Sequence, residues 1–257
     1  MPRGKELRSM SPTEQKVYFA LQNSRNDMFD INQIRSYRLC SEGMLRRALA
    51  SLVAKGWLTR VKNGLYAMGT VDQFRLGPFM FNGYAAFSSA LYLYNAFDEV
   101  PSVVYVANEN TSASRMLGNM EIRAVALGRR AIGIVEHNDY VISGKGKTLY
   151  DCFYMPENSG GYINVLRAIT LLDMRTSDWK EFIMYVNMFE GCSFRRKVGY
   201  MLDVLNRKAG GSVPHSVING LHCTGNTAKL GSGRHGHYVK EWNIMDYVST
   251  GALLGFE

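Results

Sequence analysis

The chain has 257 residues, enough for one large domain or two modest ones. Hydrophobic residues make up 46% and charged residues 20% of it, as in folded rather than disordered proteins. No run approaches the roughly 18 consecutive apolar residues of a transmembrane helix. The charged N-terminus, residues 1–8, lacks the apolar core of a signal peptide. We therefore expect a cytoplasmic protein.

Cysteine usage fits that expectation. Cys40, Cys152, Cys192 and Cys223 are far apart in the sequence and include no Cys-x-x-Cys pair. A disulfide framework is not indicated, and the default for such cysteines in the cytoplasm is the reduced thiol.

The net charge of +8 is unevenly distributed along the chain. Residues 1–69 hold 12 Lys/Arg against 5 Asp/Glu, whereas residues 70–257 hold 18 against 17. Each DNA phosphate that Lys or Arg neutralises adds affinity through counterion release, so this concentration favours DNA binding. Taken by itself, the uneven charge is explained equally well by a basic surface that faces only solvent.

Two helices are expected first. Ser11-Pro12-Thr13-Glu14 combines an N-cap, a proline at the first helical position and a glutamate three residues after the cap, which predicts a helix ending near residues 23–24. Asp30 can cap a second, short helix that ends near Tyr37.

A third helix and a hairpin follow. The third helix begins at Ser41-Glu42, has an apolar face and ends at Gly56. Residues 57–61 and 65–68 are prone to form strands, and the Asn-Gly pair between them is a strong hairpin signal. Three helices and a hairpin in this order predict a winged helix-turn-helix domain.

In such a domain the third helix enters the major groove and the wing lies along the backbone or the minor groove. The predicted DNA-binding residues are Ser41, Met44, Arg46 and Arg47 on the helix, with Arg60, Lys62 and Asn63 at the wing. The arginines can bond to a guanine edge or to a phosphate, and the sequence leaves both open. Small domains of this kind also serve as protein-docking modules.

We place the domain boundary near Gly69, giving a DNA-binding domain over residues 1–69 and a larger α+β domain over 70–257. Helices and strands mix there without regular alternation, which indicates an α+β fold. The expected segments are a connection at 71–78, helices at 82–97, 148–155, 163–173, 179–188 and 194–205, and strands at 103–107, 121–127, 131–136 and 139–143. The last fifty residues, rich in Gly and His, are expected to form loops, short strands and a tail.

Five short motifs follow the predicted winged helix in a fixed order. They are Tyr84-Ala-Ala-Phe-Ser-Ser-Ala-Leu, Val100-Pro-Ser-Val-Val-Tyr-Val-Ala, Lys147-Thr-Leu-Tyr-Asp-Cys-Phe, Gly160-Gly and Arg196-Lys-Val-Gly-Tyr-Met-Leu. In this order, over roughly residues 11–205, the chain resembles the AbiEi-type antitoxins and antitoxin-like regulators of prokaryotic abortive-infection systems. The resemblance implies a winged helix that represses its own operon and a C-terminal domain that counters a nucleotidyltransferase-like toxin. The Gly/His-rich end departs from that pattern.

Three local patterns suggest other chemistry. Ser143-Gly-Lys-Gly-Lys-Thr148 lacks the first glycine of a Walker A motif, because position 141 is valine. Four of the five histidines (His215, His222, His235 and His237) lie near the C-terminus with Cys223, but their spacing matches no zinc-finger pattern. Lys229, Arg234, His235 and Lys240 form a minor second basic patch there. We expect neither a metal nor a cofactor.

No catalytic constellation stands out. Cys152 lies among aromatic and apolar residues, which is typical of a buried structural thiol. The sequence therefore predicts a non-enzymatic regulator that binds double-stranded DNA, with an inverted-repeat operator. A nuclease-like enzyme that the winged helix targets to nucleic acid is the alternative, and a protein-docking scaffold is a third possibility.

Overall fold

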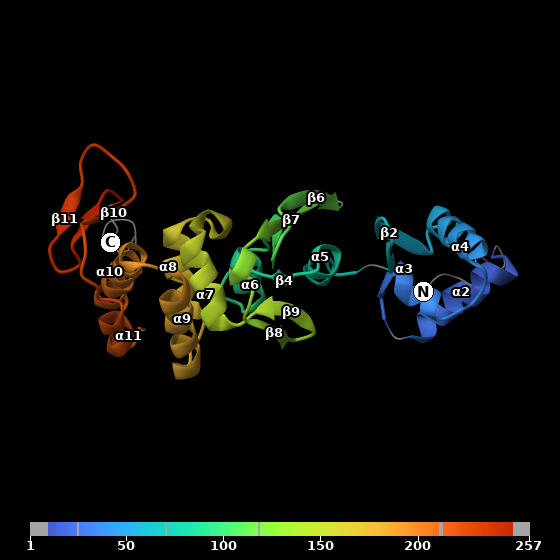
Figure 1. Ribbon diagram of the computed structural model, residues 1–257, viewed down its shortest axis with the longest axis horizontal. Helices are drawn as coiled ribbons and strands as arrows, with labels where there is room; N and C mark the ends of the chain where they lie inside the picture. The colour runs from blue at the N-terminus through green and yellow to red at the C-terminus, as the bar shows by residue number, and fades with distance from the viewer. Residues whose placement is uncertain (1–9, 25, 70, 118, 211–212, 249–257) are drawn as a thin grey trace. The chain divides into compact units, whose positions relative to one another are not determined.

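The computed structural model describes residues 10–24, 26–69, 71–117, 119–210 and 213–248 (Figure 1). The charged segment at residues 1–8, Thr70 at the expected boundary and the tail from residue 249 lie outside these ranges. The chain forms two compact units, residues 1–82 and 83–257. Among the described residues, no helix has the length and apolar character needed to cross a membrane.

The first unit is a winged helix-turn-helix. Its elements are α2 (Pro12–Asn23), β1 (Met28–Asp30), α3 (Ile31–Ser36), α4 (Glu42–Ala54), β2 (Leu58–Lys62), β3 (Leu65–Met68) and α5 (Gln73–Phe81). The three helices and the hairpin expected from the sequence are confirmed. Strand β1 was not expected: it pairs antiparallel with β3, so that the sheet order is β1-β3-β2.

Capping explains where these helices begin. The Ser11 hydroxyl accepts the Glu14 amide at 3.3 Å, and the Glu14 carboxylate accepts the Ser11 amide at 2.9 Å. Glu14 also accepts from Lys55 at 2.7 Å, which connects α2 to the end of α4 and lowers the pKa of the Glu14 carboxyl. At α3, the Asp30 carboxylate accepts the Asn32 amide at 2.7 Å.

Helix α5 occupies the segment expected to be a plain connection. Asp72 caps it by accepting the Phe74 amide at 2.8 Å. Arg75 forms an ion pair with Asp27 at 2.8 Å, and the Lys62 ammonium donates to the Met80 carbonyl. These contacts attach α5 to the winged helix. The boundary between the two units therefore lies after Asn82 rather than near Gly69.

A six-stranded mixed sheet forms one part of the second unit, in the order β6-β7-β5-β4-β9-β8. Strands β5 and β7 run parallel, as do β4 and β9, while β6 and β8 are antiparallel edges. The strands are β4 (Tyr84–Ala85), β5 (Val103–Asn108), β6 (Ala113–Leu117), β7 (Met120–Ala126), β8 (Ile134–His137) and β9 (Tyr140–Ser143).

Helices supply the rest of this unit, so the expected α+β class is confirmed. They are α6 (Phe87–Leu93), α7 (Lys145–Tyr154), α8 (Tyr162–Leu171), α9 (Thr176–Phe189), α10 (Cys192–Ala209) and α11 (His215–Gly220), with 3-10 turns η1 (Gly128–Arg130) and η2 (Pro156–Ser159). The expected single long helix over 82–97 is wrong: a turn at residues 82–83 is followed by β4, which pairs with β5, and then by a shorter α6. Strand β6 and helix α11 were also missed.

The Gly/His-rich end folds against α10. It forms a second sheet in the order β10-β12-β11, with β10 (Ala228–Leu230), β11 (His237–Val239) and β12 (Ile244–Asp246). The Trp242 indole donates to Asp203 at 3.0 Å, and the Tyr200 hydroxyl donates to Asp246 at 2.9 Å. The nearly buried Arg196 donates to backbone carbonyls of the same segment. These contacts fix residues 222–246 to α10.

The expectation of four reduced thiols is wrong for one pair. Cys192, at the start of α10, forms a disulfide with Cys223, just after α11, with the two Cα atoms 5.4 Å apart. Tertiary packing brings the two residues together across 31 positions, a contact that cysteine spacing does not reveal. Cys40 and Cys152 are free thiols.

Reduction of the Cys192–Cys223 bond should destabilise the second unit by about 2–4 kcal/mol, because closing a loop restricts the unfolded chain. Denaturant unfolding with and without dithiothreitol measures this difference. The variant C192S/C223S should unfold like the reduced protein and be insensitive to reductant. Equal unfolding curves for the oxidised and reduced wild type would contradict the prediction.

Candidate nucleic-acid interface

A hollow of about 580 Å³ lies between α3, α4 and the wing of the first unit. Its wall carries three arginines (Arg35, Arg46 and Arg60), one from each of these elements, together with Asn63 at the turn of the wing. Its apolar floor and remaining lining are Ile31, Ala50, Val53, Gly64 and Tyr66. The structure therefore brings three of the seven predicted DNA-binding residues, namely Arg46, Arg60 and Asn63, to one concave basic surface.

One carboxylate sits between two of these arginines. Glu42, in the first turn of α4, accepts from Arg35 at 2.6 and 3.0 Å and from Arg46 at 2.8 Å. These hydrogen bonds lower the pKa of Glu42 to about 2. All three side chains are well exposed, so water screens the ion pairs and they contribute little to stability. Their effect is to orient the two guanidinium groups.

The other predicted residues of α4 lie away from this hollow. Met44 and Arg47 line a shallower depression beside α2, together with Ser51. Both are exposed, and the Arg47 Nε donates to the Gly43 carbonyl at 3.2 Å. Ser41 is the exposed N-cap of α4, but its side chain makes no capping hydrogen bond. Arg46 and Arg47 thus point to different sides of the helix.

At the wing, one predicted residue is out of place. Arg60 and Asn63 bond to each other at 2.7 Å and are exposed, as expected. Lys62 is partly buried, and its ammonium group donates to the Met80 carbonyl in α5. This contact was not predictable from sequence because the segment that forms α5 was expected to be a plain connection.

Two basic residues were missed. Arg35 projects into the hollow from α3, and its place on the exposed side of that helix could have indicated it. Arg38 is exposed in the turn between α3 and α4, where its φ of 48° lies in the left-handed region. Both add positive charge next to α4.

Replacing Glu42 by Gln should raise the affinity for DNA of any sequence about threefold to tenfold at low salt. The reason is that the change removes the carboxylate that forms ion pairs with both Arg35 and Arg46. Fluorescence anisotropy with operator and scrambled duplexes measures it, and E99Q, which alters an exposed carboxylate of the second unit, is the control. An unchanged or weaker affinity would mean that Glu42 does not compete with phosphate.

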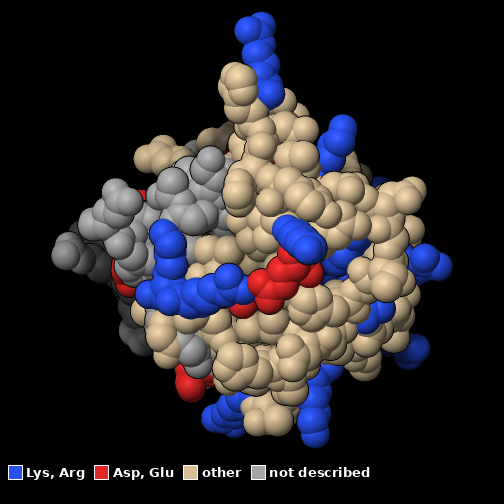
Figure 2. Space-filling model, turned by 90° about the vertical axis from the view of Figure 1, so that its left-hand side faces the viewer, with Lys and Arg blue, Asp and Glu red and all other residues tan. Residues whose placement is uncertain are grey.

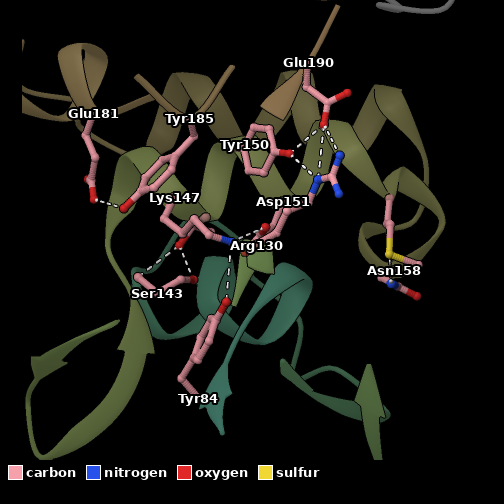
Figure 3. Close-up of polar contacts among 12 residues, drawn as sticks. Tyr84, Arg130, Ser143, Lys147, Tyr150, Asp151, Asn158, Glu181, Tyr185 and Glu190 are labelled. Carbon is pink, nitrogen blue, oxygen red and sulfur yellow. Dashed lines mark hydrogen bonds and ion pairs between the residues drawn. The ribbon is translucent and has the colours of Figure 1, made fainter. Parts of the chain in front are cut away.

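A buried polar cluster is the other conspicuous feature, in the second unit (Figure 3). Lys147 and Asp151, one helical turn apart on α7, are fully buried and form an ion pair. The Lys147 ammonium also donates to the Tyr84 hydroxyl at 3.4 Å and lies over the rings of Tyr84, Tyr150 and Tyr185. Burial lowers the pKa of Lys147 and raises that of Asp151 to about 6, although each group opposes the shift of the other.

Beside this pair, Arg130 and the Tyr150 hydroxyl both donate to Glu190, at 3.1 and 2.7 Å. Tyr150 belongs to α7 and Glu190 follows α9, so the contacts hold these helices together. Because Lys147 is fully buried, the segment Ser143–Thr148 does not present it to a nucleotide. The cluster thus lies inside the second unit, and its contacts connect α7 with the end of α9.

Of the remaining candidate chemical groups, Cys152, His222 and Cys223 are engaged in packing or in a disulfide, whereas His215, His235 and His237 are exposed. Burial raises the pKa of the Cys152 thiol to about 12, so that it is not a nucleophile at neutral pH. His222 stacks on Trp242 with ring centres 3.8 Å apart, and Cys223 is in the disulfide. Within the described ranges, no three His, Cys, Asp or Glu side chains converge as a metal site would require.

Comparison with solved structures gives a likeness of fold. No family model and no curated protein matches the chain. The solved structure titled "Crystal structure of RV2827C protein from Mycobacterium tuberculosis" superimposes with a TM-score of 0.65 at 13% sequence identity. The match covers 95% of this chain and 94% of that one, so the similarity extends over both units.

Proposed function

We propose that the protein is a DNA-binding transcriptional regulator whose first unit reads double-stranded DNA. The observation that supports this most directly is the arrangement of Arg35, Arg46, Arg60 and Asn63 around one hollow between α4 and the wing. In winged helices that bind DNA, the third helix enters the major groove and the wing follows the backbone. Phosphate and guanine edges are the ligands that arginine prefers.

The sequence resemblance supports the more specific part of the proposal. On this view the protein is an antitoxin that represses its own operon, and its second unit counters a nucleotidyltransferase-like toxin. Repression works by occlusion: two copies bind an inverted-repeat operator and block the promoter. The protein then acts in the cytoplasm, where reducing conditions would act on the Cys192–Cys223 bond.

Binding of the full chain to the DNA upstream of its own gene tests the proposal. Affinity is measured between 50 and ~200 mM salt against a scrambled duplex of equal length, with and without reductant. We expect a preference of at least about 1000-fold for the upstream DNA and a steep salt dependence. Equal affinity for both duplexes would exclude a sequence-specific regulator.

The nuclease-like alternative stays a prediction with its own test. Nucleases that use metal ions need carboxylates that converge on the ion. Incubation of labelled duplex and single-stranded DNA with the protein and Mg²⁺ or Mn²⁺ would show cleavage if this reading holds. Cleavage that survives removal of the Arg46 and Arg47 side chains would place the activity in the second unit.

A further inference from the structure

The second unit has its own concentration of positive charge. Residues 70–191 hold 10 Lys/Arg against 13 Asp/Glu, whereas residues 192–248 hold 8 Lys/Arg against 3 Asp/Glu. Figure 2 looks at this end of the chain, and blue side chains are more numerous than red ones on the face it shows. The excess of Lys and Arg therefore belongs to α10 and the second sheet.

The three acidic residues of this segment already have partners. Asp246 is buried and accepts from the Tyr200 hydroxyl at 2.9 Å. Asp203 and Glu241 both accept from Arg207, at 2.6 and 2.7 Å. None of these carboxylates pairs with the lysines and the arginine of the second sheet.

Those cations define what we call the C-terminal basic surface: Lys229, Arg234 and Lys240, with the exposed His235 and His237 between them. Each of the three charged side chains is exposed. In the part of the chain that the structure describes, none of the three forms an ion pair or a side-chain hydrogen bond. Their charge is available to a ligand.

The backbone that carries the C-terminal basic surface is held in place. A Cβ added at Gly231, which has a φ of 75°, would collide with the Val248 side chain, and one at Gly236 would lie 2.7 Å from Tyr247. The turn between β10 and β11 therefore packs closely against the residues after β12. Tyr238, 48% exposed, donates its hydroxyl to Asn243 at 3.1 Å, which fixes its ring at the surface.

We propose that the C-terminal basic surface binds the phosphate backbone of nucleic acid, as a contact separate from that of the winged helix. Unpaired cations on this turn (Arg234) and on the strands beside it (Lys229 in β10, Lys240 just after β11) can approach phosphates closely without first breaking ion pairs of their own. The exposed Tyr238 ring adds a face on which an unpaired base can stack. The proposal does not depend on the first unit reading sequence.

The test compares two full-length variants that lose the same charge. K229A/R234A/K240A removes the cations of the C-terminal basic surface, and R167A/R175A/K180A removes three exposed cations of α8, α9 and the turn between them. Anisotropy with a scrambled duplex is recorded over ~50–200 mM salt. The first variant should reduce the slope of log affinity against log salt by about 2–3 relative to the wild type. The second should change that slope by no more than about 1.

The reciprocal swap K229R/R234K/K240R keeps the charges and should restore the wild-type slope. Equal slopes for both alanine variants would overturn the proposal, since net charge alone would then account for the loss. A slope unchanged in K229A/R234A/K240A would also overturn it and would point to an acidic protein as the partner.

Repeating the series in an R46A/R47A background separates this proposal from the function proposed above. If the protein with both arginines intact shows no operator preference while the slope difference persists in the R46A/R47A background, only the proposed regulator is excluded. The variant Y238A then distinguishes a single strand from a duplex as the nucleic acid that this surface binds. Loss of affinity for a single strand but not for a duplex identifies single-stranded nucleic acid, and equal affinities identify the duplex backbone.

Discussion

The variant K147M should lower the free energy of unfolding of the second unit by about 3–5 kcal/mol. Lys147 and Asp151 are both fully buried and are each other's charged partner. Removing the ammonium leaves a buried carboxylate without its counter-charge, and Asp151 already has one oxygen with no hydrogen-bond partner. Chemical denaturation followed by circular dichroism measures the loss.

A matched control is available on α10. Arg207 pairs with Asp203 at the same four-residue spacing, but its side chain is 60% exposed. R207M should therefore cost about 1 kcal/mol or less. The double variant K147M/D151N should be less destabilised than the sum of its single changes, because neither buried charge remains. Additive losses, or equal losses for K147M and R207M, would refute the role given to the buried pair.

The stability difference between the wild type and D151N should depend on pH, because the pKa of Asp151 is raised in the folded protein. In the folded protein this carboxyl takes up a proton near pH 6, whereas in the unfolded chain it does so near its usual pKa of 3.8. Because the folded state binds the proton more tightly, the wild type should gain stability relative to D151N as the pH falls from about 6 to about 4. The measurement is the difference between the two unfolding free energies at these pH values. If the difference in unfolding free energy does not change with pH, or changes in the opposite direction, the pKa of the Asp151 carboxyl is not raised in the folded protein.

The winged helix could be predicted from sequence because its signals are local. Capping residues such as Ser11 and Asp30, the apolar face of α4 and the Asn63-Gly64 turn each act within a few positions. Strand β1 has three residues and forms only by pairing with β3, so no local pattern announced it. The same holds for β4, whose two residues lie between β5 and β9.

The candidate interface was predictable only in part, for a similar reason. Helical periodicity identified Arg46 and Arg47 as exposed, but it could not show that Glu42 holds Arg46 beside Arg35, a contact that needs α3 in place. Lys62 looked like a wing residue until α5 supplied a backbone acceptor. The buried pair Lys147–Asp151 lies at a spacing that surface helices also use, so burial was not evident from sequence.

Removal of both arginine side chains of α4 should abolish operator recognition while leaving the fold intact. Arg46 is 68% exposed in the hollow beside the wing, and Arg47 is exposed on another side of α4, so R46A/R47A should change stability little. Each bidentate contact to a base edge is worth about 1–3 kcal/mol. The double variant should therefore lose roughly 30-fold or more in affinity for the operator.

Which contact each arginine makes can be resolved by comparing single variants on operator and scrambled duplexes. An arginine that bonds to a guanine edge should weaken operator binding alone when removed, and one that holds a phosphate should weaken both duplexes equally and reduce the salt slope by about 1. K16A/R167A removes two exposed charges elsewhere and should match the wild type on both duplexes. If R46A/R47A binds the operator as tightly as the wild type, α4 is not the recognition helix. The test is specific to α4 because no other described helix of the first unit presents two adjacent exposed arginines.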